Sequence, residues 1–182
     1  MEDRNDIRRK KNMIQYCKRC CLPSTKPHLS FDEEGICNAC RNYENRKNVD
    51  WDERKKELME ILDRYRSKDG SNWDCIIPVS GGKDSTYQVI TMLELGMNPL
   101  CVTATTCDLT DIGRRNIENI KKMGVDYIEV TTNRVVRAKL NRIGLTEVGD
   151  ISWPEHVSIF TVPVRMAVNF NVPLIIWGEN SQ

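Results

Sequence analysis

Six consecutive residues have the types and order of a phosphate-binding loop: Ser80-Gly81-Gly82-Lys83-Asp84-Ser85. Two adjacent glycines let the backbone turn sharply and approach a ligand closely. Where such a turn opens a helix, the backbone amides point at an anion and the helix dipole favours negative charge. The serines add hydroxyl donors, Lys83 adds a positive charge, and Asp84 can cap the helix or help to hold Mg²⁺. We therefore predict that this loop binds phosphate groups.

The loop is not of the Walker A type, which requires G-x-x-x-x-G-K-[ST]. Lys83 is followed by Asp84, and no glycine stands five residues before Gly82. The alternative is an ordinary glycine turn without a ligand. An apolar stretch at 76–79 and a helical pattern after the loop supply the strand–loop–helix context that favours phosphate binding.

Four cysteines form a second pattern, Cys17-x-x-Cys20 and Cys37-x-x-Cys40, with sixteen residues between the pairs. This spacing is typical of a zinc site. Four thiolates complete a tetrahedron and leave no open position, so we predict a structural Zn²⁺. The alternative is four unrelated buried cysteines, but residues 16–42 hold too few apolar side chains to fold without a metal.

Alternating strands and helices are expected to position the loop. Apolar strand patterns alternate with helical patterns that end at glycines. The predicted strands are 74–79, 99–105, 127–131 and 173–177, and the predicted helices are 84–95, 111–123, 133–143 and 156–169, the last with Pro163 as an internal fault. This order indicates βαβ units and an α/β fold, a Rossmann-like parallel sheet with helices on both faces.

Four segments are predicted along the chain: a basic tail at 1–12, a small zinc-ribbon-like module at 13–45, a helix and linker at 46–72, and the domain with the phosphate-binding loop at 73–182. Asp50 is expected to cap a helix at 51–66, with Glu53 three residues on as in a capping box. The sequence stops just after the last predicted strand, so we expect the domain to be truncated at its C-terminal side.

Composition excludes several classes of protein. The chain has 182 residues, of which 40% are hydrophobic and 29% charged, as in soluble globular proteins. The net charge of +1 makes nucleic acid an unlikely partner, although the basic first nineteen residues leave an RNA-contacting arm as an alternative to a solvated tail. No signal peptide or membrane span is recognised, so we expect a cytoplasmic protein without a membrane partner. Eight cysteines in a cytoplasmic protein indicate metal binding or catalysis rather than disulfides.

The loop at 80–85 resembles the SGGxDS signature of the PP-loop ATP pyrophosphatase superfamily. The resemblance implies that ATP is cleaved between its α and β phosphates while the loop holds the leaving pyrophosphate. AMP is transferred to an oxygen of the substrate, and a nitrogen or sulfur nucleophile then displaces it. ATP and Mg²⁺ are the implied cofactors.

The same resemblance implies roles for individual residues. The end of the second strand lines the adenine pocket, and the glycine after the fourth strand lies near the nucleotide. The implied nucleotide-binding residues are Ser80, Gly81, Gly82, Lys83, Asp84, Ser85, Thr103, Ala104, Thr105 and Gly178. The implied catalytic residues are Lys83, Asp84 and Ser85.

The cysteine region narrows the resemblance to one family, the N-acetyl sugar amidotransferases. The similar segments are Tyr16-Cys17-x-x-Cys20, then Pro23, Ser24, Thr25 and Pro27, then Phe31-Asp32-x-x-Gly35-Ile36-Cys37-x-x-Cys40, and finally Trp177-Gly178-Glu179-Asn180-Ser181-Gln182. The likeness covers residues 13–182, which correspond to the front half of a typical member.

The family resemblance implies an ATP-dependent conversion of a sugar acetamido group into an acetamidino group. ATP adenylates the amide oxygen, and ammonia from a separate glutaminase subunit replaces AMP. The substrate is a nucleotide-linked or free N-acetyl sugar, and the products belong to surface polysaccharide, including lipopolysaccharide, or flagellar glycan. The fragment is expected to be inactive alone.

Two alternatives of different classes stay open. A tRNA thiolase also joins cysteine pairs to a PP-loop, but it needs catalytic cysteines and a broad basic surface. The other alternative is a non-catalytic zinc and nucleotide-binding module. A catalytic thiol at Cys101 or Cys107 would favour the thiolase, whereas the alternative for each is a buried or inert cysteine.

Further polar residues are weighed in the same way. Glu155 and His156 are expected in a loop at the strand-end side, where they could orient the sugar or move a proton, with helix capping as the alternative. Asp108 and Asp111 could touch Mg²⁺ or a ribose, but Asp111 is predicted to be an N-cap. Cys21 is expected to take no part in the metal site.

Overall fold

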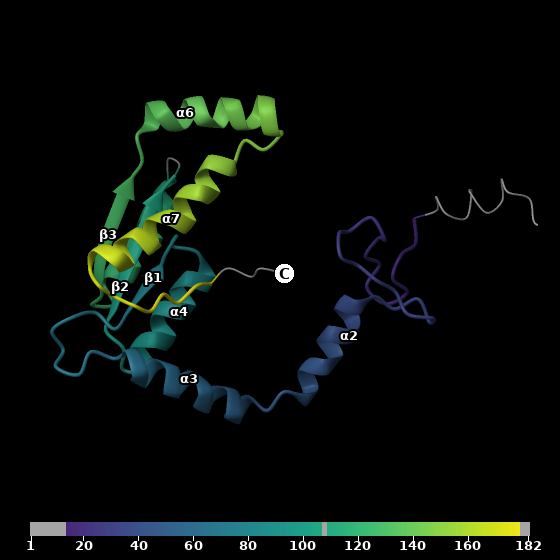
Figure 1. Cartoon of the computed structure of the whole chain (residues 1–182), viewed down its shortest axis with the longest axis horizontal. Coiled ribbons are helices and arrows are strands. Elements are labelled where there is room, and N and C mark those ends of the chain that lie inside the picture. The colour runs from purple at the N-terminus through teal and green to yellow at the C-terminus, as the bar shows by residue number, and fades with distance from the viewer. Residues whose placement is uncertain (1–13, 107–108, 179–182) are drawn as a thin grey trace, which may run out of the picture. The chain divides into compact units, whose positions relative to one another are not determined.

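A computed structural model describes residues 14–106 and 109–178 (Figure 1). The chain divides into two compact units, Met1–Lys56 and Glu57–Gln182. The predicted basic tail lies outside the described residues. None of the helices in the described ranges is long and apolar enough to cross a membrane.

The first unit is built mostly from turns around its cysteines. Two isolated antiparallel bridges, Tyr16 with Pro23 and Phe31 with Cys37, hold the turns together. Three buried cysteines form its centre, and the apolar side chains packed on them are Leu22, Leu29, Phe31 and Ile36. This core is too small to hold the turns alone, as expected of a module that needs a metal.

Three helical elements follow the cysteines. Helix α2 spans Asn38–Asn45 and was not predicted, and the 3₁₀ helix η1 spans Arg46–Asn48. Helix α3 spans Trp51–Tyr65. The Asp50 carboxylate accepts hydrogen bonds from the backbone N–H groups of Asp52 and Glu53, each at 3.0 Å, which confirms Asp50 as its N-cap.

The second unit carries a parallel sheet in the order β1–β2–β3. The strands are β1 (Cys75–Pro78), β2 (Pro99–Thr105) and β3 (Asp126–Thr131). The helices are α4 (Lys83–Glu94), α5 (Asp111–Lys121), α6 (Arg134–Ile143) and α7 (Trp153–Asn169), with a π-helical turn η2 (Gly144–Val148) after α6. The α/β fold with a parallel sheet is therefore confirmed (Figure 1).

The two faces of the sheet are covered by different helices. Alternate residues of β1 point to opposite sides, so Ile77 packs against α3, α4 and α5, whereas Ile76 packs against α7. Both faces are apolar, which is why the strands read as continuous hydrophobic runs.

The predicted last strand at 173–177 is reduced in the structure to a single parallel bridge between Ile76 and Ile175. The backbone N–H of Ile76 donates to Leu174 at 2.9 Å, and the N–H of Ile176 donates to Ile76 at 2.9 Å. The segment therefore runs beside β1 on the edge opposite β2. The chain reverses its direction across the sheet here, and such a switch point is where open α/β sheets bind ligands.

Two helix starts differ from the prediction. The side chain of Thr110, not of Asp111, caps α5 by accepting a hydrogen bond from the backbone N–H of Gly113 at 3.1 Å. Helix α7 starts at Trp153 and passes through Pro163 without ending. Glu155 and His156 therefore lie in its first turn and not in a loop.

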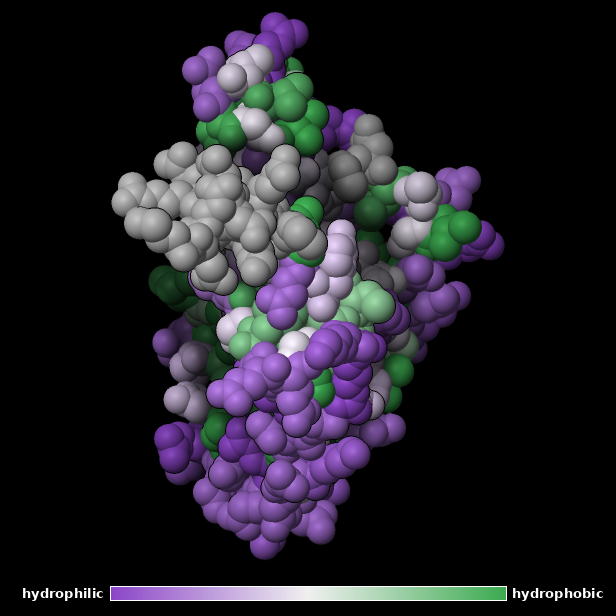
Figure 2. Space-filling view, turned by 90° about the vertical axis from the view of Figure 1, so that its right-hand side faces the viewer, coloured by the Kyte–Doolittle hydropathy of each residue, from purple (hydrophilic) through white to green (hydrophobic). Residues whose placement is uncertain are grey.

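Surface hydropathy differs between elements. Figure 2 shows the molecule of Figure 1 turned about the vertical axis, so each element stays at the same height. The lowest part, at the height of α3, is dominated by hydrophilic residues. The top, at the height of α6, shows both hydrophobic and hydrophilic residues. Val135, Val136 and Leu140 of α6 are exposed.

Candidate functional site

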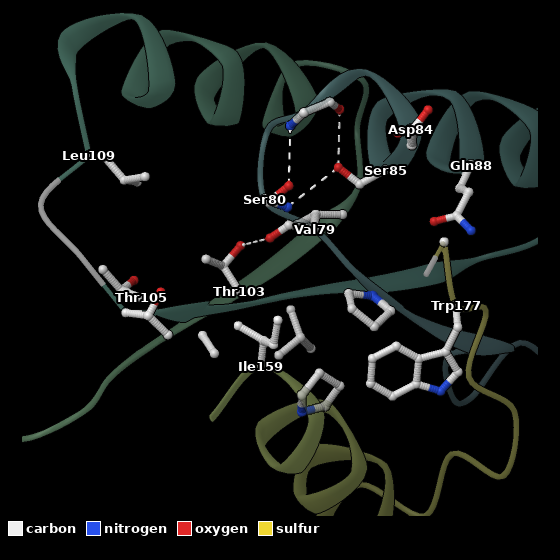
Figure 3. A pocket seen from close by; sticks show the side chains of 17 residues that line it. Val79, Ser80, Asp84, Ser85, Gln88, Thr103, Thr105, Leu109, Ile159 and Trp177 are labelled. Carbon is white, nitrogen blue, oxygen red and sulfur yellow. Dashed lines mark hydrogen bonds between the residues drawn. The ribbon is translucent and has the colours of Figure 1, made fainter. Parts of the chain in front are cut away.

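A cleft opens at the carboxyl ends of β1 and β2, beside the segment that follows α7 (Figure 3). Its volume is about 280 Å³, close to the lower end of the roughly 300–1,000 Å³ of small-molecule sites. Most of the predicted nucleotide-binding residues line it: Ser80, Gly82, Asp84, Ser85, Thr103, Ala104, Thr105 and Gly178. Gly81 and Lys83 are not among the lining residues in the described part of the chain.

Hydrogen bonds within the phosphate loop fix its shape. The backbone N–H of Ser80 donates to Ser85 Oγ at 3.4 Å, and Ser85 Oγ donates to the Gly82 carbonyl at 3.2 Å. Ser80 Oγ accepts from the N–H of Gly82 at 3.3 Å (Figure 3). The two serines thus close the turn internally.

Gly81 is required for this turn. It has a φ of +77°, in the left-handed region that other residues rarely adopt. An added Cβ would lie 3.2 Å from Asn116 Cβ and 3.3 Å from Ile117 Cγ1, both on α5.

Changing Gly81 to alanine is expected to destabilise the fold by about 1–2 kcal/mol, because the left-handed backbone conformation then carries a steric penalty. The loss should exceed that of Gly70→Ala, because the added Cβ at Gly81 also crowds Asn116 and Ile117. Urea denaturation of the variant and of Gly70→Ala provides the measurement. Gly70 also has a positive φ, of +67°, but an added Cβ there meets nothing within 4 Å. A loss for Gly81→Ala no greater than for Gly70→Ala would show that packing against α5 does not constrain the loop.

The charged residues of the loop are directed partly to solvent. Lys83 Nζ lies 2.6 Å from Asp84 Oδ1, and their side chains are 88% and 73% exposed. An ion pair this exposed contributes little stability. Lys83 can therefore leave Asp84 for a phosphate at small cost.

The end of β2 forms the floor of the cleft. The Thr103 hydroxyl donates to the Val79 carbonyl, which ties β2 to β1 (Figure 3). The Thr105 hydroxyl donates to Glu129 Oε1 on β3 at 2.5 Å, and Arg114 Nη1 lies 3.0 Å from each Glu129 oxygen. These contacts fix the three strand ends relative to one another.

The Glu129 carboxyl has a pKa below its usual value. The hydrogen bond from Thr105 is the main cause, the Arg114 guanidinium adds to it, and partial burial acts in the opposite direction. Its charged form is thus favoured in the folded protein.

The lowered Glu129 pKa predicts a stability change with pH. An unfolded glutamate titrates near about 4.3, so the stabilisation is fully present above that pH and is lost as the pH falls through the lower folded value. Urea midpoints should therefore fall more steeply below about pH 4.3 for the unchanged protein than for Glu129→Gln. Parallel curves for the two proteins would contradict the prediction.

Another wall of the cleft contains two residues that the sequence analysis missed, Gln88 and Trp177. Gln88 lies one helical turn after Asp84 on α4, and an added Cβ at Gly178 would be 2.8 Å from Gln88 Oε1. That buried oxygen has no hydrogen-bond partner among the described residues. Trp177 packs against Phe160 of α7 with ring centroids 5.4 Å apart and the ring planes tilted by 39°. The spacing of four residues from Asp84 was the one signal that could have identified Gln88.

The four predicted metal ligands come together in the first unit. The sulfurs of Cys17, Cys20, Cys37 and Cys40 all lie within 4.8 Å of one another. The Cys17–Cys40 distance is 3.9 Å and the Cys20–Cys37 distance is 3.5 Å. A tetrahedron with Zn–S bonds of about 2.3 Å has edges of about 3.8 Å, so the cluster has the size of a zinc site.

Electrostatics of the cluster also favour a cation. Burial raises the pKa of Cys17, but backbone N–H groups, including that of Cys37 at 3.3 Å, outweigh it and lower the pKa to about 6. Burial raises the pKa of Cys40 to about 12, and the three neighbouring cysteines add to the effect. Four thiolates this close repel one another, and a divalent cation removes that repulsion.

Three other weighed residues, Cys101, His156 and Cys21, do not line the cleft. Cys101 is fully buried in β2, and burial raises its pKa to about 12, which does not suit a nucleophilic thiol. His156 is exposed on α7. Cys21 is exposed and apart from the metal cluster. Cys107 and Asp108, together with 179–182 of the family-like C-terminal segment, lie outside the described residues.

Comparisons with known proteins support the fold. No protein-family model matches the chain. An uncharacterised protein of Methanocaldococcus jannaschii is 31% identical over 108 residues, which are 58% of this chain and 38% of that protein.

Two solved structures are similar to the chain. The NMN synthetase from Francisella tularensis gives a TM-score of 0.53 at 13% identity, over 73% of this chain and 56% of that one. The NH3-dependent NAD synthetase from Campylobacter jejuni, in complex with the nitrate ion, gives a TM-score of 0.50 at 14% identity, over 72% and 58%. At these identities the similarity establishes the fold alone, and the chain spans just over half of each structure.

Proposed function

We propose that the protein uses ATP to activate an amide, which ammonia then converts into an amidine. The observation that carries the proposal is the internally hydrogen-bonded loop at 80–85, which opens α4 at the sheet's switch point and faces the cleft. Its backbone amides would hold the β and γ phosphates. Asp84 has the carboxylate that Mg²⁺ prefers and lines the same cleft.

The remaining lining suits the nucleoside. Val102, Ala104, Ile159 and Pro163 give the middle of the cleft apolar walls. An adenine ring would pack between β2 and α7, with its α-phosphate directed toward the loop. Gln88 Oε1 offers a ligand N–H an acceptor on the opposite wall.

The reaction has two steps. The acetamido oxygen attacks the α-phosphorus, which forms a C–O–AMP bond and releases pyrophosphate to the loop. Ammonia then adds to the carbon of the activated acetamido group. The acetamido oxygen leaves as part of AMP, and loss of a proton gives the acetamidine. The similarity to an NH3-dependent synthetase agrees with ammonia as the nucleophile. The family resemblance supports an N-acetyl sugar as substrate, a cytoplasmic glutaminase as the ammonia source, and a role in surface glycan synthesis.

The thiolase alternative receives little support. Its chemistry needs an accessible thiolate near the ATP, and Cys101 is buried with a raised pKa. No cysteine lines the cleft in the described ranges, and Cys107 lies outside them.

The products of ATP provide the test. The protein would be incubated with Mg-ATP, ammonium and a nucleotide-linked N-acetyl sugar, and separately with tRNA and a sulfur donor. AMP and pyrophosphate should form only in the first mixture, and Asp84→Asn should reduce their amount. Their formation by residues 1–182 would also overturn the expectation that the fragment is inactive alone. ADP and inorganic phosphate as products, or AMP formation that depends on tRNA, would contradict the proposal.

A further inference from the structure

A second hollow, of about 510 Å³, lies between α6 and α7. Its polar lining residues are Thr106, Arg137, Asn141, Arg142 and Glu155. Thr106 also lines the phosphate-loop cleft. The two hollows therefore meet at the end of β2, so that ligands in them would be neighbours.

Asn141 and Glu155 form a polar pair in which the side-chain amide of Asn141 has one possible orientation. Asn141 Nδ2 lies 3.0 Å from the Ile151 carbonyl and 2.6 Å from Glu155 Oε1. Both partners are acceptors, so the donating NH₂ group must point at them. Asn141 Oδ1 and Glu155 Oε2 are then left buried, without hydrogen-bond partners among the described residues.

Buried acceptors of this kind normally have donors. A ligand that brings N–H or O–H groups into the hollow would supply them. The pair thus favours a ligand rich in hydroxyl or amide groups over an apolar one.

Two arginines give the same hollow a positive side. Arg142 is exposed and Arg137 is half-buried on α6, and neither forms an ion pair with a carboxylate in the part of the chain that the structure describes. A guanidinium group binds a phosphate through two parallel hydrogen bonds. The hollow therefore combines acceptors for a polyhydroxyl group with donors for an anion.

The turn between α6 and α7 holds this arrangement in place. The backbone N–H of Asp150 donates to the Gly144 carbonyl at 3.1 Å. An added Cβ at Gly144 would lie 2.6 Å from the Asp150 oxygen, so only glycine fits. This closure keeps Ile151 and its carbonyl beside Asn141.

We propose that the hollow between α6 and α7 is the acceptor-substrate subsite and takes a sugar phosphate. The inference rests on the proposed function and specifies where its acceptor binds. Hydroxyl and amide N–H groups of the sugar meet Asn141 and Glu155, and the phosphate meets Arg137 and Arg142. The junction at Thr106 lets an acetamido oxygen reach the α-phosphate of ATP in the adjoining cleft.

Calorimetry on the full chain without ATP tests the subsite, with N-acetylglucosamine 1-phosphate as the probe. Binding should weaken at least tenfold in Asn141→Ala, in Glu155→Gln and in Arg142→Ala. Lys139→Ala is the matched control, because Lys139 lies on the same helix but does not line this hollow. Circular dichroism and an unchanged ATP affinity would show that each variant is folded.

Free N-acetylglucosamine and inorganic phosphate should each bind more weakly than the sugar phosphate. Inorganic phosphate binding as tightly as the probe, equal probe affinity in all the variants, or no binding of the probe at millimolar concentration would each overturn the inference. Sugar-phosphate binding that depends on Asn141 and Glu155 without any AMP formation would uphold the subsite and overturn the proposed reaction. AMP formation that is unchanged in these variants would uphold the proposed reaction and overturn the subsite.

Discussion

Replacing Cys37 with serine is expected to remove the metal from the protein and to unfold the turns around the cysteines. Cys37 is fully buried, its sulfur lies 3.5 Å from that of Cys20, and its N–H donates to Cys17 Sγ. A serine hydroxyl is a poor zinc ligand at neutral pH. Since the surrounding apolar cluster is small, we expect a bound metal to supply most of the module's folding free energy.

Metal content and proteolysis measure this effect. The unchanged protein should contain about one zinc per chain, and Cys37→Ser should contain almost none. Limited proteolysis should then cut the variant within 16–42 and leave the sheet domain intact. Cys21→Ser is the matched control, because Cys21 is next to a ligand but exposed and outside the cluster. A metal-free protein whose module resists protease as the zinc-loaded one does would show that the four cysteines need no cation.

Replacing Lys83 with alanine should weaken ATP binding by about 1.5–3 kcal/mol, the usual contribution of a charge-assisted hydrogen bond. This corresponds to a roughly 10- to 150-fold rise in Kd. The structure places the ammonium on the Asp84 carboxylate, and it must turn to the phosphates when ATP binds. The exposed ion pair offers little resistance to that movement.

Calorimetry with Mg-ATP provides the measurement, and Lys122→Ala provides the control. Lys122 is exposed at the C-terminal end of α5, away from the cleft. The effect of Lys83→Ala should shrink at high salt, because exposed charges are then screened. An unchanged ATP affinity in Lys83→Ala would remove Lys83 from the phosphate site.

Elements with strong local sequence signals could be predicted from the sequence alone. The second strand has the predicted bounds, Pro99–Thr105, because a continuous apolar run between two turn signals has one reading in an α/β protein. The cysteine cluster could be predicted because the spacing of its four ligands is short and specific. The ligand roles of the phosphate-loop residues stay predictions.

Other features depend on contacts that local patterns do not contain. Thr110, and not Asp111, is the N-cap of α5. Both residue types can cap a helix and they are adjacent, so only the tertiary fold decides which one precedes the helix. Helix α2 is polar, and the residue it buries is Cys40 of the metal cluster. The hollow between α6 and α7 depends on a bond between residues fourteen positions apart, from Asn141 to Glu155.

The last segment of the sheet has a consequence for synthesis on the ribosome. Both backbone groups of Ile76 on one edge of β1 bond to residues around Ile175, which lies 175 − 76 = 99 positions later. At about 5–20 residues per second, roughly 5–20 s pass between the translation of the two partners. During that interval the nascent chain has an apolar strand with an unpaired edge, which can add a strand from another chain. A chaperone that shields the emerging polypeptide would therefore matter most for this protein in the period before Ile175 leaves the ribosome.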